Sequence, residues 1–211
     1  PGICYSAFIP NVKGAQRAIA AGVDELKIGM TASETFNKLN VRMTAEMALQ
    51  SFREIAARAR VEGRRIAAVM GTAFGCPYEG KIAPSRVLEL TGGMIEAGAG
   101  IVYFADTTGM ANPATVHELV TQARNRWPSV RFGLHLHNTR GIGIANALAG
   151  LHAGVVDFES SIGGLGGCPF APRAVGNICT EDFVHMLHEM GYETGIDLDA
   201  RIASDEQPGG R

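Results

Sequence analysis

Short apolar segments alternate along the chain with longer stretches in which apolar residues recur at helical spacing. The short segments predict β-strands, and the longer stretches predict amphipathic helices. Some helices have clear end signals, such as Asn112-Pro113 before one and Gly98 after another. We expect strands at residues 3–8, 25–28, 65–71, 101–105, 131–135 and 155–159, and helices at residues 13–21, 44–62, 84–97, 113–126, 142–153 and 180–190.

The regular alternation of strand and helix predicts an α/β fold whose parallel sheet is connected by right-handed crossovers. An open doubly wound sheet and a TIM barrel both fit this pattern. A doubly wound sheet that binds a dinucleotide carries Gly-x-Gly-x-x-Gly after its first strand, and the chain lacks that motif there. The related triplet Gly141-Ile-Gly143 comes late in the chain and is a weak signal alone.

Composition indicates an ordinary globular domain. The 211 residues are 46% hydrophobic and 19% charged, with a net charge of −2. This charge balance does not indicate a surface that binds nucleic acid or an anionic membrane. No apolar run reaches the roughly 18 residues of a membrane span. Residues 204–211 are polar and rich in glycine. We therefore expect one domain over residues 1–203 and a disordered polar tail over residues 204–211.

The four cysteines, Cys4, Cys76, Cys168 and Cys179, form no C-x-x-C pair. Such spacing is more typical of reduced thiols than of a disulfide framework or a zinc finger. It predicts a cytoplasmic protein, or a protein of the mitochondrial matrix if the chain is eukaryotic.

The most informative polar residues are His135 and His137, at the carboxyl end of the strand expected at residues 131–135. Side chains alternate faces along a strand, so both imidazoles point the same way, roughly 7 Å apart along the chain. In parallel α/β folds this end of the sheet carries the chemistry. Two imidazoles on one face can share a metal ion, although packing is the commoner role of an isolated pair.

A glycine-rich segment that contains Cys168 follows later in the chain, and Gly176-Asn177 comes after it. Together with the histidine pair, these motifs resemble the HMG-CoA lyase family of metal-dependent TIM-barrel lyases. The similarity covers the chain from Pro1 to about Asp199. The resembling segments are His135-Leu-His-Asn-Thr139, Gly163-Gly-Leu-Gly-Gly-Cys-Pro-Phe-Ala-Pro172, Gly176-Asn177 with Thr180-Glu-Asp182, and Gly75-Cys-Pro-Tyr-Glu-Gly-Lys81.

The resemblance implies a TIM (β/α)8 barrel of which this chain carries about six βα units, the family's strands 3 to 8. The strand expected at residues 3–8 is similar to the family's third strand. The first two units would then lie outside this sequence, and a partial barrel would expose two sheet edges. The family's first strand also supplies an aspartate to the metal and an adjacent arginine to the substrate, and both would be missing here.

The cofactor that the resemblance implies is a divalent metal ion held by His135, His137 and Asn177. Mixed oxygen and nitrogen ligands suit Mg²⁺ or Mn²⁺, and the histidines would also accept Zn²⁺ or Co²⁺. For Asn177 the alternative is a turn residue, because Gly-Asn is a common turn pair.

The reaction that the resemblance implies is cleavage of 3-hydroxy-3-methylglutaryl-CoA to acetoacetate and acetyl-CoA. Catalytic roles fall on three residues. His135 is a ligand or a base, Cys168 transfers a proton when a glycine-rich lid closes, and Asp106 faces the active rim at the end of its strand. The alternatives are a small buried side chain for Cys168 and a turn-forming aspartate for Asp106.

The resemblance assigns substrate contacts to Thr107, Asn138 and Gly167. Asn138 stands where the family commonly has Asp, and Arg173 stands where it commonly has Gly. Since these departures surround the expected substrate, they leave the acyl group open.

Other functions compete with this one. Citramalyl-CoA or another 3-hydroxy-3-methyl acyl-CoA is an alternative substrate of the same chemistry. A Claisen-condensing synthase is disfavoured because that branch does not share the glycine-rich cysteine loop. An inactive metal-binding fragment is the non-enzymatic alternative. The expected partner is a small acyl-CoA molecule, with no nucleic acid and no membrane, and a homodimer is a further expectation from the resemblance.

Overall fold

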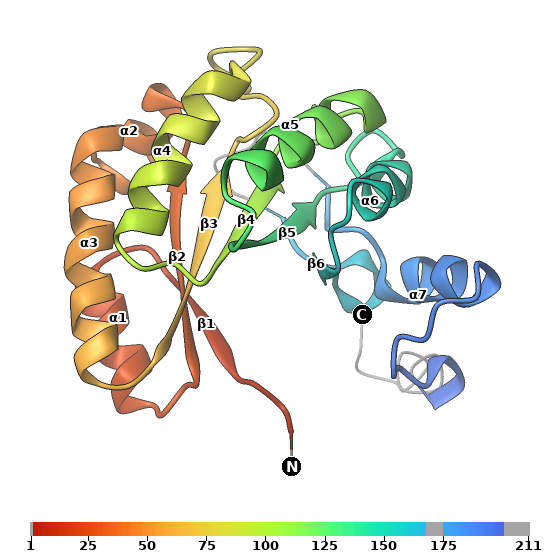
Figure 1. Cartoon of the computed structure of the whole chain (residues 1–211), viewed down its shortest axis with the longest axis horizontal. Coiled ribbons are helices and arrows are strands. Elements are labelled where there is room, and N and C mark those ends of the chain that lie inside the picture. The colour runs from red at the N-terminus through yellow and green to blue at the C-terminus, as the bar shows by residue number, and fades with distance from the viewer. Residues whose placement is uncertain (1, 168–174, 201–211) are drawn as a thin grey trace.

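The computed structural model describes residues 2–167 and 175–200, which form one parallel β-sheet with helices packed outside its curve (Figure 1). The strands follow chain order, β1-β2-β3-β4-β5-β6. They are β1 (Ser6–Ile9), β2 (Glu25–Thr31), β3 (Arg65–Gly71), β4 (Ile101–Asp106), β5 (Arg131–Leu136) and β6 (Asp157–Glu159). The helices are α1 (Val12–Ala20), α2 (Glu34–Val41), α3 (Ala45–Val61), α4 (Pro84–Glu96), α5 (Pro113–Arg126), α6 (Gly143–His152), the 3₁₀ turn η1 (Ile162–Gly164) and α7 (Thr180–Glu189).

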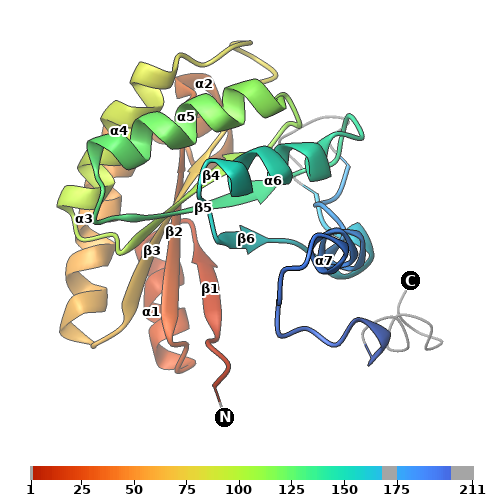
Figure 2. The same cartoon turned by 45° about the vertical axis from the view of Figure 1, so that its right-hand side comes forward.

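The sheet curls so strongly that its two outer regions face each other. Lys27 of β2 contacts Glu159 of β6 across the concave side, although the two strands are separated by three others in the sheet. Figure 2 shows this curve, with β1 and β6 as the two end strands of the sheet. A curled parallel sheet with helices outside is the architecture of part of a TIM barrel, which confirms the expected fold class.

Side chains on the two faces of the sheet have different surroundings. Phe104 of β4 and Leu134 of β5 belong to the large core between sheet and helices. Because side chains alternate along a strand, the residues beside them point to the concave face. Those concave residues form a small separate apolar cluster, made of Ala67, Val69, Ile101, Tyr103 and Ala105.

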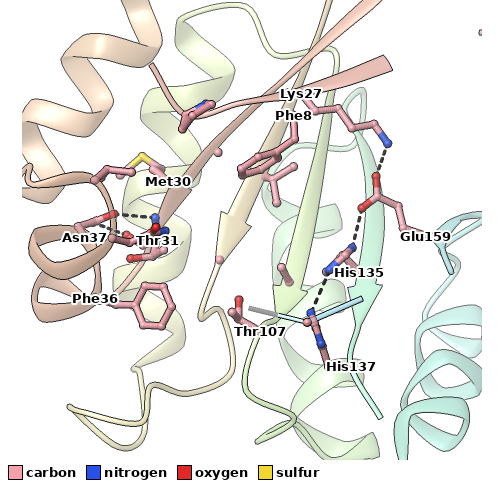
Figure 3. A pocket seen from close by; sticks show the side chains of 18 of the residues that line it. Phe8, Lys27, Met30, Thr31, Phe36, Asn37, Thr107, His135, His137 and Glu159 are labelled. Carbon is pink, nitrogen blue, oxygen red and sulfur yellow. Dashed lines mark hydrogen bonds and ion pairs between the residues drawn. The ribbon is translucent and has the colours of Figure 1, made fainter. Parts of the chain in front are cut away.

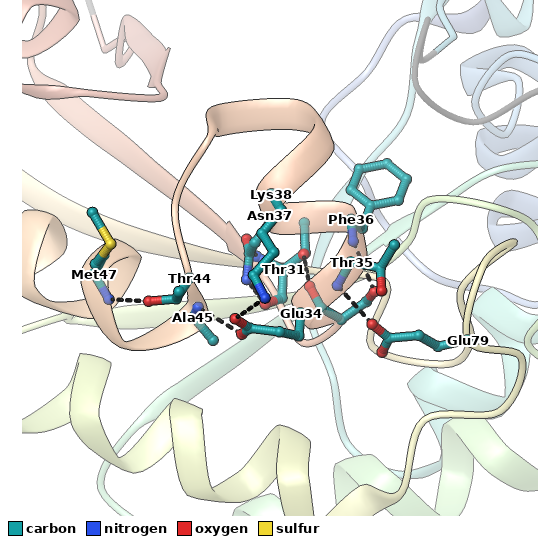
Figure 4. Close-up of polar contacts among 11 residues, drawn as sticks. Thr31, Glu34, Thr35, Phe36, Asn37, Lys38, Thr44, Ala45, Met47 and Glu79 are labelled. Atoms are coloured by element: carbon teal, nitrogen blue, oxygen red, sulfur yellow. Dashed lines mark hydrogen bonds and ion pairs between the residues drawn. The ribbon is translucent and has the colours of Figure 1, made fainter.

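Helix α2 was not predicted from the hydrophobic pattern. Its eight residues bury only Phe36 and Asn37, so it has almost no apolar period to detect. Polar contacts hold it instead (Figure 4). The Asn37 side chain accepts from Thr31 N at 3.0 Å and donates to Thr31 O at 2.7 Å, and Ser33 Oγ accepts from Phe36 N at the start of the helix.

All twelve expected elements are present; β3 and α5 have the expected bounds, and the other ten have shifted ends. β6 begins at Asp157 rather than at residue 155, because Val155 N donates to Gly150 O at the end of α6 and pairing with β5 starts only at Asp157. β4 and β5 each extend one residue further than expected, to Asp106 and Leu136. The predicted tail at residues 204–211 lies outside the described residues. Within the described ranges, no helix is long and apolar enough to cross a membrane.

Candidate metal centre

A pocket of about 550 Å³ lies on the concave face of the sheet (Figure 3). It is lined by side chains from the strands and from the loops after their carboxyl ends, where TIM barrels place their active sites. The lining residues include Lys27, Thr107, His135, His137, Glu159 and Gly167.

The two predicted histidines meet in this pocket. His135 and His137 alternate along the chain with Leu134 and Leu136, which are fully buried on the helix side. Their Nε2 atoms lie 3.3 Å apart. Two nitrogens bound to one ion at about 2.1 Å would be about 3.0–3.4 Å apart for right-angled to tetrahedral geometry. The observed separation therefore fits two ligands of a single metal ion.

The hydrogen bonds of the two rings define which nitrogen carries the proton. His137 Nδ1 lies 3.0 Å from Val175 O, and a carbonyl oxygen can only accept, so His137 Nδ1 is the donor. His135 Nδ1 lies 2.8 Å from Glu159 Oε2, and a carboxylate paired with Lys27 is likewise an acceptor. In the neutral rings both Nε2 atoms then carry lone pairs. The contact between the two Nε2 atoms is therefore made either through a proton on one of the rings or through a cation that both nitrogens bind.

Burial lowers the pKa of His137, and the neighbouring His135 lowers it further, against the hydrogen bond to Val175 O. His137 is therefore neutral near pH 7, which is the protonation state of a metal-binding imidazole.

Asn177 lies beside the histidine pair. His137 and Asn177 form an isolated antiparallel bridge, and Asn177 Nδ2 donates to Leu165 O at 2.8 Å. Its Oδ1 is buried and has no hydrogen-bond partner among the described residues. A buried acceptor without a donor is costly unless a cation or another polar group satisfies it. An amide oxygen in this state can bind a cation, but Asn177 is not among the residues that line the pocket, so its role as the third metal ligand stays a prediction.

The glycine-rich segment approaches Asn177 so closely that side chains are excluded. A Cβ on Gly176 would lie 1.7 Å from Gly164 O, and a Cβ on Gly166 would lie 2.5 Å from Asn177 Nδ2. These glycines therefore allow the two segments to pack against each other. Cys168, the predicted proton-transfer residue in this segment, lies outside the described residues.

Asp106 is placed on the helix side of β4, next to buried Phe104, and is not among the pocket-lining residues described. Its Oδ1 accepts from Met110 N at 2.8 Å and from Ala111 N at 3.1 Å. These contacts match the turn-forming alternative. The expectation that Asp106 faces the active rim is thus not met in this arrangement, while its catalytic role stays a prediction.

The predicted substrate-contact residues occupy different positions. Thr107 lines the pocket, and its Oγ1 accepts from Thr72 N at 3.0 Å, which leaves its O–H to donate. Gly167 also lines the pocket. Asn138 Oδ1 accepts from Gly143 N at 3.0 Å at the start of α6, so it orders the loop after the histidines. Contact with a substrate stays a prediction for all three.

Lys27 and Glu159 were not identified from the sequence. Lys27 Nζ pairs with Glu159 and also lies 4.6 Å from the centroid of the Tyr103 ring. Burial disfavours the Glu159 anion, but hydrogen bonds from His135 and Lys27 outweigh it and hold the pKa of Glu159 below its usual value. Across the described ranges, no group of three or more His, Cys, Asp or Glu side chains could by itself hold a metal ion.

Comparison with known proteins extends this picture. The (R)-citramalyl-CoA lyase of Chloroflexus aurantiacus is 43% identical over 202 residues, which cover 96% of this chain and 64% of that enzyme. The cytoplasmic 3-hydroxy-3-methylglutaryl-CoA lyase of Danio rerio is 38% identical over 198 residues, 94% of this chain and 59% of that enzyme. The chain thus spans roughly three fifths of the length of these relatives.

Solved structures show the same relationship. An HMG-CoA lyase from Acinetobacter baumannii, in complex with coenzyme A and 3-methylmalate, has a TM-score of 0.91 and 44% identity over 95% of this chain and 66% of that chain. The carboxyl transferase domain of Rhizobium etli pyruvate carboxylase shares the fold, with a TM-score of 0.73 at 18% identity over 97% of this chain and 34% of that one. A family model described as HMGL-like matches residues 3–205. The resemblance seen in the motifs is confirmed, and the chain belongs to the HMGL-like family.

Proposed function

We propose that the protein containing this chain is a metal-dependent lyase that cleaves a carbon–carbon bond of a 3-hydroxy-3-methyl acyl-CoA. The observation that carries the proposal is the pair of facing Nε2 atoms, 3.3 Å apart, next to the bridge from His137 to Asn177, whose Oδ1 has no hydrogen-bond partner among the described residues. Imidazole nitrogens and an amide oxygen are donors that a divalent cation can bind. The family match supports the reaction class.

His135, His137 and Asn177 would hold the ion, and Mg²⁺ or Mn²⁺ suits this mixture of nitrogen and oxygen donors. A bound divalent ion would polarise the hydroxyl and carbonyl oxygens of the substrate and lower the pKa of the hydroxyl. Thr107 can donate its O–H to an acyl oxygen in the same pocket, because its lone pair already accepts from Thr72 N. An aspartate from a segment outside this chain would complete the ligand set, as the family resemblance implies.

The cleavage requires two proton transfers. A base removes the hydroxyl proton, the bond between the α-carbon of the thioester and the hydroxyl-bearing β-carbon breaks, a ketone forms, and the electron pair remains on the acetyl-CoA enolate. The enolate carbon is then protonated, a role that we assign to Cys168. His135 cannot accept the hydroxyl proton at Nε2 while that atom binds a metal ion, so its roles as ligand and as base exclude each other at any one moment.

HMG-CoA is our first choice of substrate, with acetoacetate as the second product. Citramalyl-CoA, which would release pyruvate, is a second candidate, because the citramalyl-CoA lyase is 43% identical to this chain and the Danio rerio HMG-CoA lyase is 38% identical. The same chemistry applies to both, since each has a tertiary hydroxyl group on the carbon β to the thioester. A cytoplasmic location and a homodimer also stay proposals.

The experiment uses the full-length protein, purified free of metal, with and without Mn²⁺. Acetoacetate and pyruvate are measured separately after addition of HMG-CoA or citramalyl-CoA, because acetyl-CoA is common to both reactions. We expect cleavage only with metal, and at least a 100-fold loss of Mn²⁺ affinity in His137→Ala. Cleavage without metal, unchanged affinity in the variant, or no cleavage of either substrate would overturn the proposal.

A further inference from the structure

We propose that Glu159 is a positioning residue that aims the Nε2 lone pair of His135 at the metal position, and that Lys27 holds Glu159 in place. This inference rests on the proposed metal site and extends it to residues that bind no metal themselves. It makes the orientation of one ligand depend on an ion pair that crosses the inside of the curled sheet.

The contacts form a continuous chain across three strands (Figure 3). Lys27 on β2 pairs with Glu159 Oε1, and Glu159 Oε2 lies 2.8 Å from His135 Nδ1 on β5. His135 and Glu159 are direct register partners on neighbouring strands and point to the same face. The His135 ring therefore has its carboxylate partner on the adjacent strand, whereas the cation that fixes that carboxylate comes from across the concave face.

Glu159 controls the tautomer of His135. A carboxylate accepts and cannot donate, so the hydrogen bond is formed only when Nδ1 carries the proton, which leaves Nε2 free to bind a cation. A carboxylate partner also makes the imidazole a stronger ligand. With a neutral amide at residue 159, the ring could adopt either tautomer, and in one of them Nε2 is blocked by its own proton.

Lys27 limits the positions that Glu159 can take. Its ammonium binds the second carboxylate oxygen and rests on the Tyr103 ring, at 4.6 Å from the centroid. The side chains of Lys27 and Glu159 are 18% and 21% exposed, so this pair is less screened than one on the outer surface. Without Lys27, one oxygen of a largely buried carboxylate would lose its charged partner.

His137 provides an internal reference, because it is fixed in a different way. Its Nδ1 donates to the backbone carbonyl of Val175 at 3.0 Å, which no side-chain substitution at residues 27 or 159 removes. The proposal therefore predicts that substitutions at these two positions affect His135 and spare His137. General damage to the fold would change both rings.

The experiment uses the full-length protein with ¹⁵N-labelled histidine, first with metal removed and then titrated with Mn²⁺. Long-range ¹H–¹⁵N spectra report the tautomer of each ring, assigned with single histidine variants. In the wild type, both rings should show protonated Nδ1. In Glu159→Gln, His135 should lose this signature while His137 keeps it, and Mn²⁺ affinity should fall about 10–100-fold. Lys27→Met should weaken binding in the same direction by a smaller factor.

The matched control is Asp157→Asn, which removes a carboxylate of β6 that pairs with Arg131 of β5 outside the pocket. It should leave both the tautomers and Mn²⁺ affinity unchanged. If Glu159→Gln does not fold, Lys27→Met and Glu159→Asp decide the question, and Glu159→Asp should keep more of the affinity than Lys27→Met with Nδ1 of His135 still protonated.

Two failures can be told apart. A wild-type protein that does not bind Mn²⁺ would overturn the proposed function. If the wild type binds Mn²⁺ and Glu159→Gln binds it equally well, only the positioning role is overturned. If Glu159→Gln does not fold, wild-type affinity in both Lys27→Met and Glu159→Asp has the same meaning. A change of both histidine signatures in these variants would also overturn it, because it would show a structural effect rather than an effect on one ring.

Discussion

The loop after β4 is built around Asp106, whose carboxylate is buried and accepts backbone hydrogen bonds. Asp106 is only 1% exposed, and Met110 N and Ala111 N donate hydrogen bonds to its carboxylate. Burial raises the pKa of Asp106 to about 6, against the lowering effect of these two donors. A buried carboxylate with such a pKa makes stability depend on pH.

The size of this pH dependence follows from the difference between the pKa of Asp106 in the folded state and its ordinary pKa. The ordinary pKa is 3.8, so between about pH 4 and pH 6 the folded state binds more protons than the unfolded state. Stability from this group is therefore fully present below about pH 4 and is lost as pH rises through about 6. At about 1.4 kcal/mol for each pKa unit, the loss is roughly 3 kcal/mol.

Asp106→Asn keeps an oxygen acceptor and cannot ionise. The free energy of unfolding, measured by urea denaturation of the full-length protein from pH 4 to pH 7.5, should therefore rise in the variant relative to the wild type by roughly 2–3 kcal/mol across this range. Asp24→Asn controls for the loss of one negative charge, because Asp24 accepts from Tyr5 N at an exposed position. A difference between variant and wild type that stays constant with pH would refute the argument. Turnover measured at the same pH values separates this role from a catalytic one, which would lower kcat without a change in folding.

Three further predictions concern packing, catalysis and helix capping. Gly133→Ala would place a Cβ 2.4 Å from Tyr103 Cε1, so it should lower the free energy of unfolding in urea by about 1–3 kcal/mol. Gly100→Ala is the control, because a Cβ there would make only an ordinary contact. Equal effects of the two substitutions would contradict the packing argument. Cys168→Ser should lower kcat about 10²–10⁴-fold with Mn²⁺ affinity unchanged, and a near-normal kcat would show that this thiol transfers no proton. Asn112→Ala removes a capping box at the start of α5 and should cost about 0.5–2 kcal/mol in thermal or urea unfolding, so an unchanged midpoint would contradict a stabilising cap.

The sheet could be predicted because the sequence signals for its strands lie within short segments of the chain. Most strands are short, largely apolar segments followed by a helix, and parallel crossovers then determine the order of the strands. Helix α2 could not be predicted in this way, because Asn37 holds it through backbone hydrogen bonds to Thr31 rather than through an apolar stripe. A method that reads hydrophobic period does not detect an element stabilised by one buried amide.

The histidine pair was predictable from strand alternation, but its partners were not. Lys27 stands between Leu26 and Ile28, which are buried, and a charge in that setting is a local signal for a position on the concave face. Nothing local predicts its partner Glu159, because the two residues are 132 positions apart and meet only through the curl of the sheet. Alternation also explains Asp106, which shares the helix side of β4 with Phe104.

The bridge between His137 and Asn177 has a consequence for the connectivity of the chain. These two residues enclose a loop of about 40 residues that contains α6, β6 and the glycine-rich segment. An ion bound to both would act as a removable cross-link, and for a loop of this length the chain-entropy model gives a permanent cross-link about 4 kcal/mol. A metal–ligand bond exchanges with solvent, so the attachment of α7 to the rest of the sheet would be tightened or relaxed by the concentration of free metal in the surrounding solution.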